Sequence, residues 1–438
     1  MTLFHRRLIY VFFIVVFLLA APAVILYTQG YRYNLKKSRV QKTGIFIISS
    51  LPRRANIYLN GEPFPNTTPA RLENILPGDY EVKLTKDGYH DWQKKLTVLE
   101  NSTTFAEKII LWKNSQPVSL SSVSPSDWLT APDQKKAAII NKNQLLFLDF
   151  SDGKLLPLAD LSQYSTVSLE GWSNTSKKIL VKTSPDQTGD YLVYTIEQKI
   201  NKTPFKISGQ KYRLMKWDLE NDNLLYGLNE QGAWQIDLFS GQEKLLYADT
   251  GIRDFLFLDG QYYSFKDQKL NKVQPNGQNP EFLEEVRCDD CLFANRYFPK
   301  VILLDKKAQK TFIADPDQID PLIKLDSGQI DWLKDGSLLL SNQWELWIYE
   351  NKKNEPELIT RLGQPIKQAL WHPLGRHLIF TENNKIRIIE LDNRELRNIT
   401  DLIDLERLDY LASDSSGSNL YLAGTFNDQA GIFKINIK

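Results

Sequence analysis

The chain has 438 residues, too many for a single hydrophobic core, so we expect two or more domains. Its 54 lysines and arginines nearly balance 53 aspartates and glutamates, and a net charge of +1 argues against a nucleic-acid-binding protein. Two cysteines exclude a disulfide-rich scaffold and four histidines leave little imidazole for catalysis or metal binding, whereas an aromatic content of 11% suits a β-rich fold.

Residues 8–27 form an uncharged apolar run, LIYVFFIVVFLLAAPAVILY. As a helix this run would be about 30 Å long, which matches the hydrocarbon core of a bilayer. The small residues of Ala21-Pro22-Ala23 would also suit a signal-peptide cleavage site, but apolar residues continue past it to Tyr27. The run therefore predicts a retained single-pass transmembrane helix, preceded by a short tail (1–7) and followed by a basic linker (28–43).

The side of the membrane on which the body lies is signalled in two opposite ways. Five basic residues follow the helix, namely Arg32, Lys36, Lys37, Arg39 and Lys42. The positive-inside rule alone would keep the following domain in the cytoplasm. A short tail before a single span is instead the usual signal-anchor layout, and long domains are translocated largely regardless of flanking charge. We expect an extracytoplasmic body, with a cytoplasmic-facing body as the alternative.

Residues 44–112 consist of short strand patterns separated by turn signals. Asn60-Gly61 is typical of a tight hairpin, because both residues adopt positive φ at low cost. After a Pro-Gly turn, Tyr80, Val82 and Leu84 alternate on one face of a strand. We therefore expect a small β-sandwich.

The same segment resembles the PEGA domain over residues 44–99. The motifs that carry the resemblance are Pro52-Arg53-Arg54-Ala55, Leu59-Asn60-Gly61, Thr68-Pro69, Leu76-Pro77-Gly78-Asp79-Tyr80-Glu81-Val82 and Gly88-Tyr89. Arg53-Arg54 replaces the Glu-Gly pair of the family signature, so a shared ligand is not implied, and a solvated loop is the simplest interpretation of the two arginines. The resemblance implies a small β-sandwich with a binding role on a bacterial or archaeal surface, and it supports an extracytoplasmic body.

Residues 113–438 repeat a unit of roughly 40 residues, the length of one four-stranded propeller blade. Each unit contains an apolar anchor followed by a turn and alternating strands; the anchors are Trp128, Trp172, Trp217, Phe257, Phe293, Trp332, Trp371 and Leu411. The units resemble WD-type and TolB-like repeats, most clearly in WHPLGRHLIF (371–380). The units near Phe257 and Phe293 are identified by their spacing more than by their residues, and the last anchor is placed near Leu411. We predict an all-β chain in which a seven- or eight-bladed β-propeller follows the sandwich; a pair of irregular β-sandwiches is the alternative.

The last repeat supplies three strand patterns, at 407–413, 419–426 and 431–437, and would leave an unpaired outer edge. One strand pattern, 117–123, is left over before the first anchor. We therefore expect 117–123 to pair antiparallel with 431–437 and close the ring.

Few residues suggest chemistry. Cys288-Asp289-Asp290-Cys291 lacks two further zinc ligands and the helix start of a redox pair, so it predicts a local disulfide or two unreactive thiols. The segment DPDQID (315–320) lacks the glycine of a calcium loop, and His372 and His377 have no nucleophile motif to serve. We predict no catalytic, cofactor-binding or metal-binding residue, and no cofactor.

These features predict a bacterial, membrane-anchored protein of the cell envelope that binds or scaffolds without catalysis. Its partners would be the membrane, through one span, and an unidentified protein or glycan, but no nucleic acid. Exposed tryptophans, with Trp344 or Trp347 as the candidate, could anchor that partner. One alternative is a propeller-based glycan hydrolase or lyase, which needs carboxylates that converge at the central channel. The other is a cytoplasmic-facing assembly scaffold.

Overall fold

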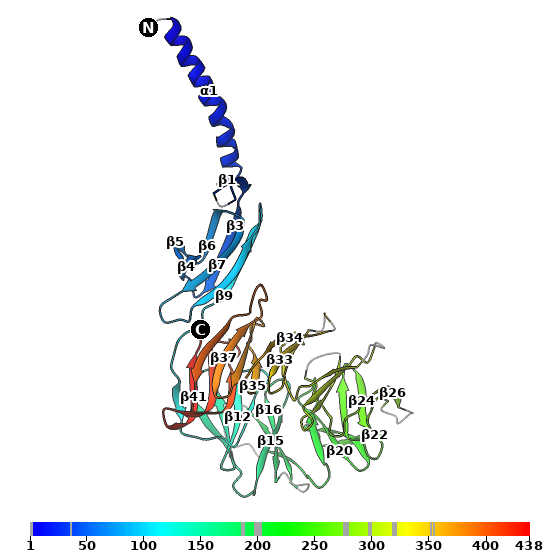
Figure 1. The fold of residues 1–438 in the computed structure, drawn as a ribbon. Coiled ribbons are helices and arrows are strands. Elements are labelled where there is room, and N and C mark those ends of the chain that lie inside the picture. Colours follow the sequence, from blue (N-terminus) through cyan, green and yellow to red (C-terminus); the bar gives the residue numbers. More distant parts are fainter. Residues whose placement is uncertain are drawn as a thin grey trace. The chain divides into compact units, whose positions relative to one another are not determined.

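The computed structural model describes residues 3–35, 37–184, 189–196, 204–274, 280–296, 300–317, 322–350, 353 and 355–438 (Figure 1). It divides into two compact units. The first contains Met1–Ser115 together with Asp392–Thr400 and Lys438, and the second contains Gln116–Leu391 and Asp401–Ile437.

The first unit begins with helix α1 (Leu3–Thr28), whose apolar side chains are exposed along its length. The segment Arg6–Thr28 has a mean hydropathy of 2.9 and is long and apolar enough to cross a membrane. The helix ends where Gly30 adopts a φ of +84°, a left-handed conformation that favours glycine. The chain then enters a two-stranded hairpin of β1 (Tyr31–Asn34) and β2 (Arg39–Lys42).

Seven further strands form the predicted small sandwich. One sheet has the order β6-β3-β9 and the other β5-β4-β7-β8. Their bounds are β3 (Gly44–Leu51), β4 (Asn56–Leu59), β5 (Glu62–Thr67), β6 (Ala70–Ile75), β7 (Gly78–Thr85), β8 (Trp92–Val98) and β9 (Thr103–Ile110). Alternate residues of β3, such as Phe46 and Ile48, are fully buried and meet Val82 and Leu84 of β7 in one core. Asn60-Gly61 forms the turn between β4 and β5, as the sequence predicts.

The first unit also contains residues 392–400, which follow one propeller strand in the sequence and include the first two residues of the next. The side chain of Lys94 in β8 is fully buried, and its ammonium group donates to the main-chain oxygen of Asp392 at 2.7 Å. The carboxylate of Asp392 lies 3.8 Å from the same nitrogen. A buried cation is costly unless it has hydrogen-bond and charge partners. Residues 392–400 supply such partners to Lys94 through Asp392.

The second unit contains, in its described residues, eight four-stranded antiparallel sheets. The first four sheets are β11 (Asp127–Thr130), β12 (Lys136–Asn141), β13 (Gln144–Asp149) and β14 (Leu155–Asp160); β15 (Val167–Trp172), β16 (Lys178–Thr183), β17 (Tyr191–Thr195) and β18 (Phe205–Ile207); β19 (Leu214–Trp217), β20 (Leu224–Asn229), β21 (Gly232–Asp237) and β22 (Glu243–Ala248); and β23 (Asp254–Leu258), β24 (Gln261–Lys266), β25 (Lys269–Val273) and β26 (Glu281–Glu285). The next three are β27 (Leu292–Phe293), β28 (Val301–Asp305), β29 (Lys310–Ala314) and β30 (Ile323–Leu325); β31 (Gln329–Trp332), β32 (Leu338–Ser341), β33 (Glu345–Tyr349) and β34 (Pro356–Arg361); and β35 (Ile366–Trp371), β36 (His377–Glu382), β37 (Lys385–Glu390) and β38 (Ile399–Asp404). The eighth has the order β10 (Val118–Ser121), β41 (Gln429–Asn436), β40 (Asn419–Phe426) and β39 (Arg407–Ser413).

This arrangement is an eight-bladed β-propeller, which excludes the pair of irregular sandwiches (Figure 1). Each of the eight predicted anchors falls on the first strand of one blade, counting β39 as the first strand of the last. The anchor spacing in the sequence therefore identifies every blade, including the two that are least regular, around Phe257 and Phe293.

The ring is closed as predicted. Strand β10 pairs antiparallel with β41, and Val118, Ser119 and Ser121 lie opposite Lys434, Phe433 and Ile432. The first and last blades also share a core, in which the rings of Phe150 and Tyr421 stack with centroids 4.1 Å apart. The hydroxyl of Tyr421 donates to the main-chain oxygen of Phe150. The two ends of the propeller sequence are thus joined by a strand pair and by packed side chains.

Deletion of residues 431–438 should destabilise the whole propeller. The deletion removes most of β41, including the buried side chains of Ile432, Phe433, Ile435 and Ile437. It leaves β10 without its partner strand and β40 paired with β39 alone. Burial of four such side chains contributes on the order of 8 kcal/mol, so we expect a large fall in the melting temperature or loss of the cooperative transition in calorimetry. Deletion of Lys438 alone is the control and should leave the transition unchanged. Equal melting temperatures for the two truncations would contradict the closure by β41.

Candidate functional site in the propeller channel

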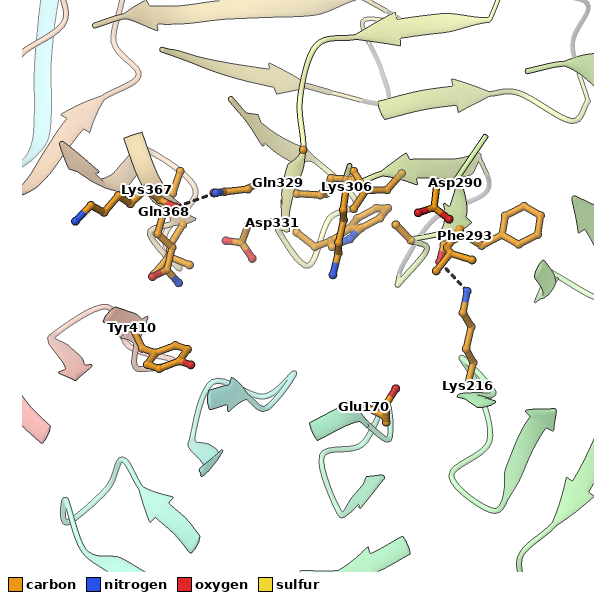
Figure 2. Close-up of a pocket in the computed structure, with 18 of the residues that line it drawn as sticks. Glu170, Lys216, Asp290, Phe293, Lys306, Gln329, Asp331, Lys367, Gln368 and Tyr410 are labelled. Atoms are coloured by element: carbon orange, nitrogen blue, oxygen red, sulfur yellow. Dashed lines mark hydrogen bonds between the residues drawn. The ribbon is translucent and has the colours of Figure 1, made fainter. Parts of the chain in front are cut away.

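A cavity of about 900 Å³ lies among the first strands of the blades (Figure 2). It is lined by β15, β19, β27, β31, β35 and β39, and by residues close to them. Its charged and polar lining residues are Glu170, Lys216, Asp290, Lys306, Gln329, Asp331, Lys367, Gln368, Thr381, Asp409 and Tyr410. Apolar side chains such as Leu292, Ile330 and Leu370 fill the spaces between them. The cavity thus offers charges of both signs on a partly apolar wall.

A second cavity, of about 430 Å³, adjoins the first and shares Glu170, Lys216 and Trp332 with it. Its wall is aromatic and includes Trp172 and Trp217. The indole N–H groups of these two tryptophans donate to main-chain oxygens of the preceding blade, at Leu129 and Gly171, over 2.8 and 2.9 Å. The tryptophan anchors therefore hold neighbouring blades together as well as forming the wall.

Three aspartates on the first strands repeat one arrangement. One oxygen of Asp127 accepts the N–H of Trp128 and the other accepts the N–H of Leu169 in the next blade, both at 2.8 Å. Asp254 does the same with Phe255 and with Phe293 in the following blade, at 2.8 and 2.6 Å.

Asp331 continues this pattern by accepting the N–H of Trp371 in the next blade at 2.7 Å. Burial raises the pKa of the Asp331 carboxyl group above its usual range, although the N–H groups of Trp371 and Trp332 oppose this. The carboxylate at the cavity wall is thus part of the contact between blades.

Lys216 extends this connection over three blades. Its ammonium group pairs with the carboxylate of Asp254 in the next blade and donates to the main-chain oxygen of Phe293 in the blade after that, at 3.1 Å (Figure 2). The side chain of Asp254 is 1% exposed and that of Lys216 is 29% exposed. A nearly buried carboxylate therefore holds a lysine at the edge of the cavity.

The other charged side chains of the cavity differ in their ion-pair and hydrogen-bond partners. Asp290 pairs with Arg253, and Asp409 with Arg407 at 3.0 Å. Lys367 donates to the side-chain oxygen of Asn384 at 2.7 Å.

Glu170 accepts the hydroxyl of Ser168 at 2.8 Å. Lys306 is exposed and reaches toward the open space, and among the described residues no hydrogen bond or ion pair is assigned to its ammonium group (Figure 2). Lys306 is therefore the cation of this wall that is most available to a ligand.

The structure distinguishes between the two states predicted for the cysteines. Cys288 and Cys291 form a disulfide, one of the two states that the sequence allows. Asp305 lies beside them, and its Oδ2 atom is 3.2 Å from the sulfur of Cys288. Because the two sulfurs are bonded to each other, they are not thiolate ligands for a metal in this state. Of the calcium-like segment, residues 318–320 lie outside the described residues.

His372 and His377, which lie on either side of Pro373 and Gly375, have contacts that suit a role in the fold. The Nε2 atom of His372 lies 3.0 Å from the main-chain oxygen of Gly417 in the next blade. Burial lowers the pKa of His377 to about 3, and His372 and Arg376 add to this effect. With this lowered pKa, His377 is a neutral imidazole at physiological pH and not the imidazolium form that acts as a general acid.

Of the two candidate surface tryptophans, Trp344 is 46% exposed in the turn between β32 and β33. Trp347 packs against the core of its blade, and its indole N–H donates to Glu345 at 3.0 Å. Trp344 is therefore the one of the pair that a partner could reach.

Three residues of the cavity wall have a signal in the sequence, but not as ligand-binding residues: Phe293 and Trp332 are blade anchors, and Asp290 belongs to the cysteine segment. A signal for three of the blade-linking carboxylates is present, since an aspartate immediately precedes an aromatic residue at Asp127-Trp128, Asp254-Phe255 and Asp331-Trp332. Lys216 and Lys306 have no such signal, because their exposure to the channel depends on how the blades are placed around it.

Comparison with known proteins bears on both units. Residues 43–109 match the PEGA domain. The match covers the sandwich and confirms that part of the resemblance. Arg54, which stands in place of the signature glycine, is exposed and has a φ of 62°, a conformation that glycine adopts at less cost than arginine. The fold thus keeps the glycine-type backbone although the residue has changed.

No curated protein matches the chain in sequence. Among solved structures, the chain is similar to the crystal structure of the eukaryotic initiation factor, with a TM-score of 0.47 and 15% identity over 68% of this chain and 81% of that one. It is also similar to the crystal structure of the mitotic checkpoint complex, with a TM-score of 0.40 and 12% identity over 72% of this chain and 92% of that one. The propeller itself is defined by the eight sheets described above.

Replacement of Asp254 by Asn should destabilise the propeller by about 3 kcal/mol, because it removes the charge partner of Lys216 and places an amide nitrogen near two N–H donors. Urea unfolding of the full chain in detergent, followed by tryptophan fluorescence, measures the effect. The matched control is Asp152→Asn, which breaks the exposed pair with Lys154 and should change the free energy of unfolding by less than about 0.5 kcal/mol. Equal effects of the two substitutions would contradict a structural role for Asp254.

Proposed function

We propose that this chain is a single-span, membrane-anchored scaffold of the bacterial cell envelope, whose sandwich and propeller lie outside the cytoplasm. In this proposal the propeller channel binds a segment of a partner protein and catalyses no reaction. The observation that carries it is the state of the cavity carboxylates, which are already engaged by groups of the protein itself.

A hydrolase or lyase of glycans would need two carboxyl groups on either side of the bond to be cleaved, one to give or take a proton and the other to act as base or nucleophile. Asp331 is bound by an N–H of the next blade, and Asp290 and Asp409 are paired with arginines. Glu170 accepts a serine hydroxyl. Among the described residues, each carboxylate of the wall therefore has a partner, and the geometry favours binding over acid-base catalysis.

The remaining surface of the cavity suits a peptide more than a uniform polymer. Cationic Lys306 and the aromatic ring of Tyr410 lie on a wall that also presents Leu292, Ile330 and Leu370 (Figure 2). Peptides vary along their length between apolar and charged side chains, so a wall of mixed character can select one segment of a protein. A glycan is the second candidate ligand.

Three features support the extracytoplasmic placement. The apolar helix α1 is a candidate membrane span or signal anchor, and the PEGA domain is typical of cell surfaces. The disulfide between Cys288 and Cys291 suits an oxidising compartment, because thiols are kept reduced in most cytosols. The basic residues that follow α1 favour the alternative, a cytoplasmic-facing scaffold.

Protease treatment of intact spheroplasts carrying a tag after Lys438 distinguishes the two placements. We expect loss of the tag in intact spheroplasts, because the body would lie on the accessible side. A cytoplasmic protein of the same cells serves as the control for intact membranes and should survive. A tag that is degraded only after the cells are lysed would place the body in the cytoplasm.

Photocrosslinking tests the channel as the binding site. A photoreactive phenylalanine derivative in place of Lys306 should give a protease-sensitive adduct in intact cells, because the side chain reaches into the cavity. The same residue in place of Lys154, which is exposed in the turn between β13 and β14, is the control. Adducts of equal yield from both positions, or none from position 306, would contradict the proposal, and an adduct that resists protease but yields to glycan-degrading enzymes would favour the glycan.

A further inference from the structure

The hairpin of β1 and β2 has two different faces. Antiparallel register places Arg32 opposite Gln41 and Asn34 opposite Arg39, and these residues face the sandwich. The side chains of Asn34 and Gln41 are buried and joined by a hydrogen bond of 2.8 Å. Gln41 also donates to Glu100, at 2.8 Å, which belongs to the turn between β8 and β9. This face is therefore occupied.

The opposite face consists of the alternate residues of both strands. Tyr33 lies opposite Val40, and Tyr31 lies opposite Lys42. Tyr33 is 56% exposed and Val40 is 51% exposed, and Leu35 in the turn is 83% exposed. The ammonium group of Lys42 lies 5.5 Å from the centre of the Tyr31 ring. The hairpin thus presents a face of aromatic, aliphatic and cationic side chains, of which Tyr33, Leu35 and Val40 are exposed and Tyr31 and Lys42 are half-buried.

Helix α1 and the hairpin are held to each other by Arg32. Its guanidinium group lies 3.6 Å from the centre of the Tyr27 ring and donates to the main-chain oxygen of Tyr27 at 2.7 Å. The same group donates to the side-chain oxygen of Asn74 in β6 at 2.8 Å. A cation at the carboxyl end of a helix is favoured by the helix dipole. Arg32 therefore fixes the sandwich to the end of the helix.

The position of the hairpin along the chain identifies what would meet its outer face. The apolar run of α1 ends at Tyr27, and β1 begins at Tyr31, about one helical turn of chain later. Residues 28–43 contain five basic residues and no acidic one. Aromatic rings beside lysines and arginines are the composition that favours the membrane–water interface. A bilayer that contains α1 would therefore place its headgroups at the level of the hairpin.

We propose that the outer face of the hairpin, formed by Tyr31, Tyr33, Leu35, Val40 and Lys42, binds the headgroup region of a membrane containing anionic phospholipids. The proposal rests on the proposed membrane anchoring of α1. Tyr33, Leu35 and Val40 enter the interface, while Lys37 and Lys42 pair with lipid phosphates. The bound hairpin, held by Arg32, then sets the orientation of the sandwich on the membrane.

Depth-dependent quenching in lipid nanodiscs tests this proposal with the full chain. Leu35→Cys is labelled with a polarity-sensitive fluorophore under non-reducing conditions, so that the disulfide of Cys288 and Cys291 stays closed. Leu51→Cys is the matched control, because Leu51 is exposed at the opposite end of β3 from the hairpin. Discs are made from phosphatidylcholine alone or with phosphatidylglycerol, each with a lipid that carries a spin label near its headgroup.

We expect at least a twofold greater quenching of the probe at position 35 than at position 51, and a further increase with phosphatidylglycerol. Replacement of Lys37 and Lys42 by Gln should abolish that increase. Equal quenching at both positions, equal quenching with both lipids, or shielding of position 35 only in discs with two chains would overturn the proposal. A chain that does not incorporate into discs would instead refute the membrane anchoring on which the proposal rests.

Discussion

The pairing of β10 with β41 is the interaction on which the propeller depends. Blades of a propeller bury their faces only against neighbouring blades, so an open ring would expose the cores of its first and last members. Here the first strand of the second unit completes the last blade, and the core shared by Phe150 and Tyr421 lies directly behind it. The cavity is a consequence of this closure, because its lining comes from six different blades.

The polar groups of the channel show how the ring maintains its geometry. A carboxylate on a first strand is costly to desolvate, yet Asp127, Asp254 and Asp331 recover that cost through N–H groups of their own and the next blade. Their hydrogen bonds fix the spacing between blades more narrowly than apolar packing alone can. Hydrogen bonds that join neighbouring blades in this way suit recognition of a partner by a preorganised surface.

The sequence predicts the fold better than the site, for a physical reason. Blade anchors such as Trp128 and Trp371 repeat because each blade packs against its neighbours through the same position of its first strand. The strand at 431–437 would otherwise be an unpaired edge, so it requires a partner strand. Both constraints leave a regular pattern in the sequence, so they can be predicted from it. The cavity charges Lys216 and Lys306 follow no repeat, because their roles depend on which blades become neighbours around the channel. The partner of Lys94, from residues 392–400, is likewise set by folding and has no sequence signal.

The basic segment after α1 shows how one sequence feature can serve two physical purposes. The segment contains five positive charges, and under the positive-inside rule these charges alone would favour a cytoplasmic body. In the fold, Arg32 bridges the helix end and β6, and Arg39 lies 4.0 Å from Glu100. These two charges thus have structural reasons to be present on either side of a membrane. Lys37 and Lys42 remain as cations near Tyr33 and Leu35, and the proposed contact with lipid would give these two charges a role that does not require a cytoplasmic body.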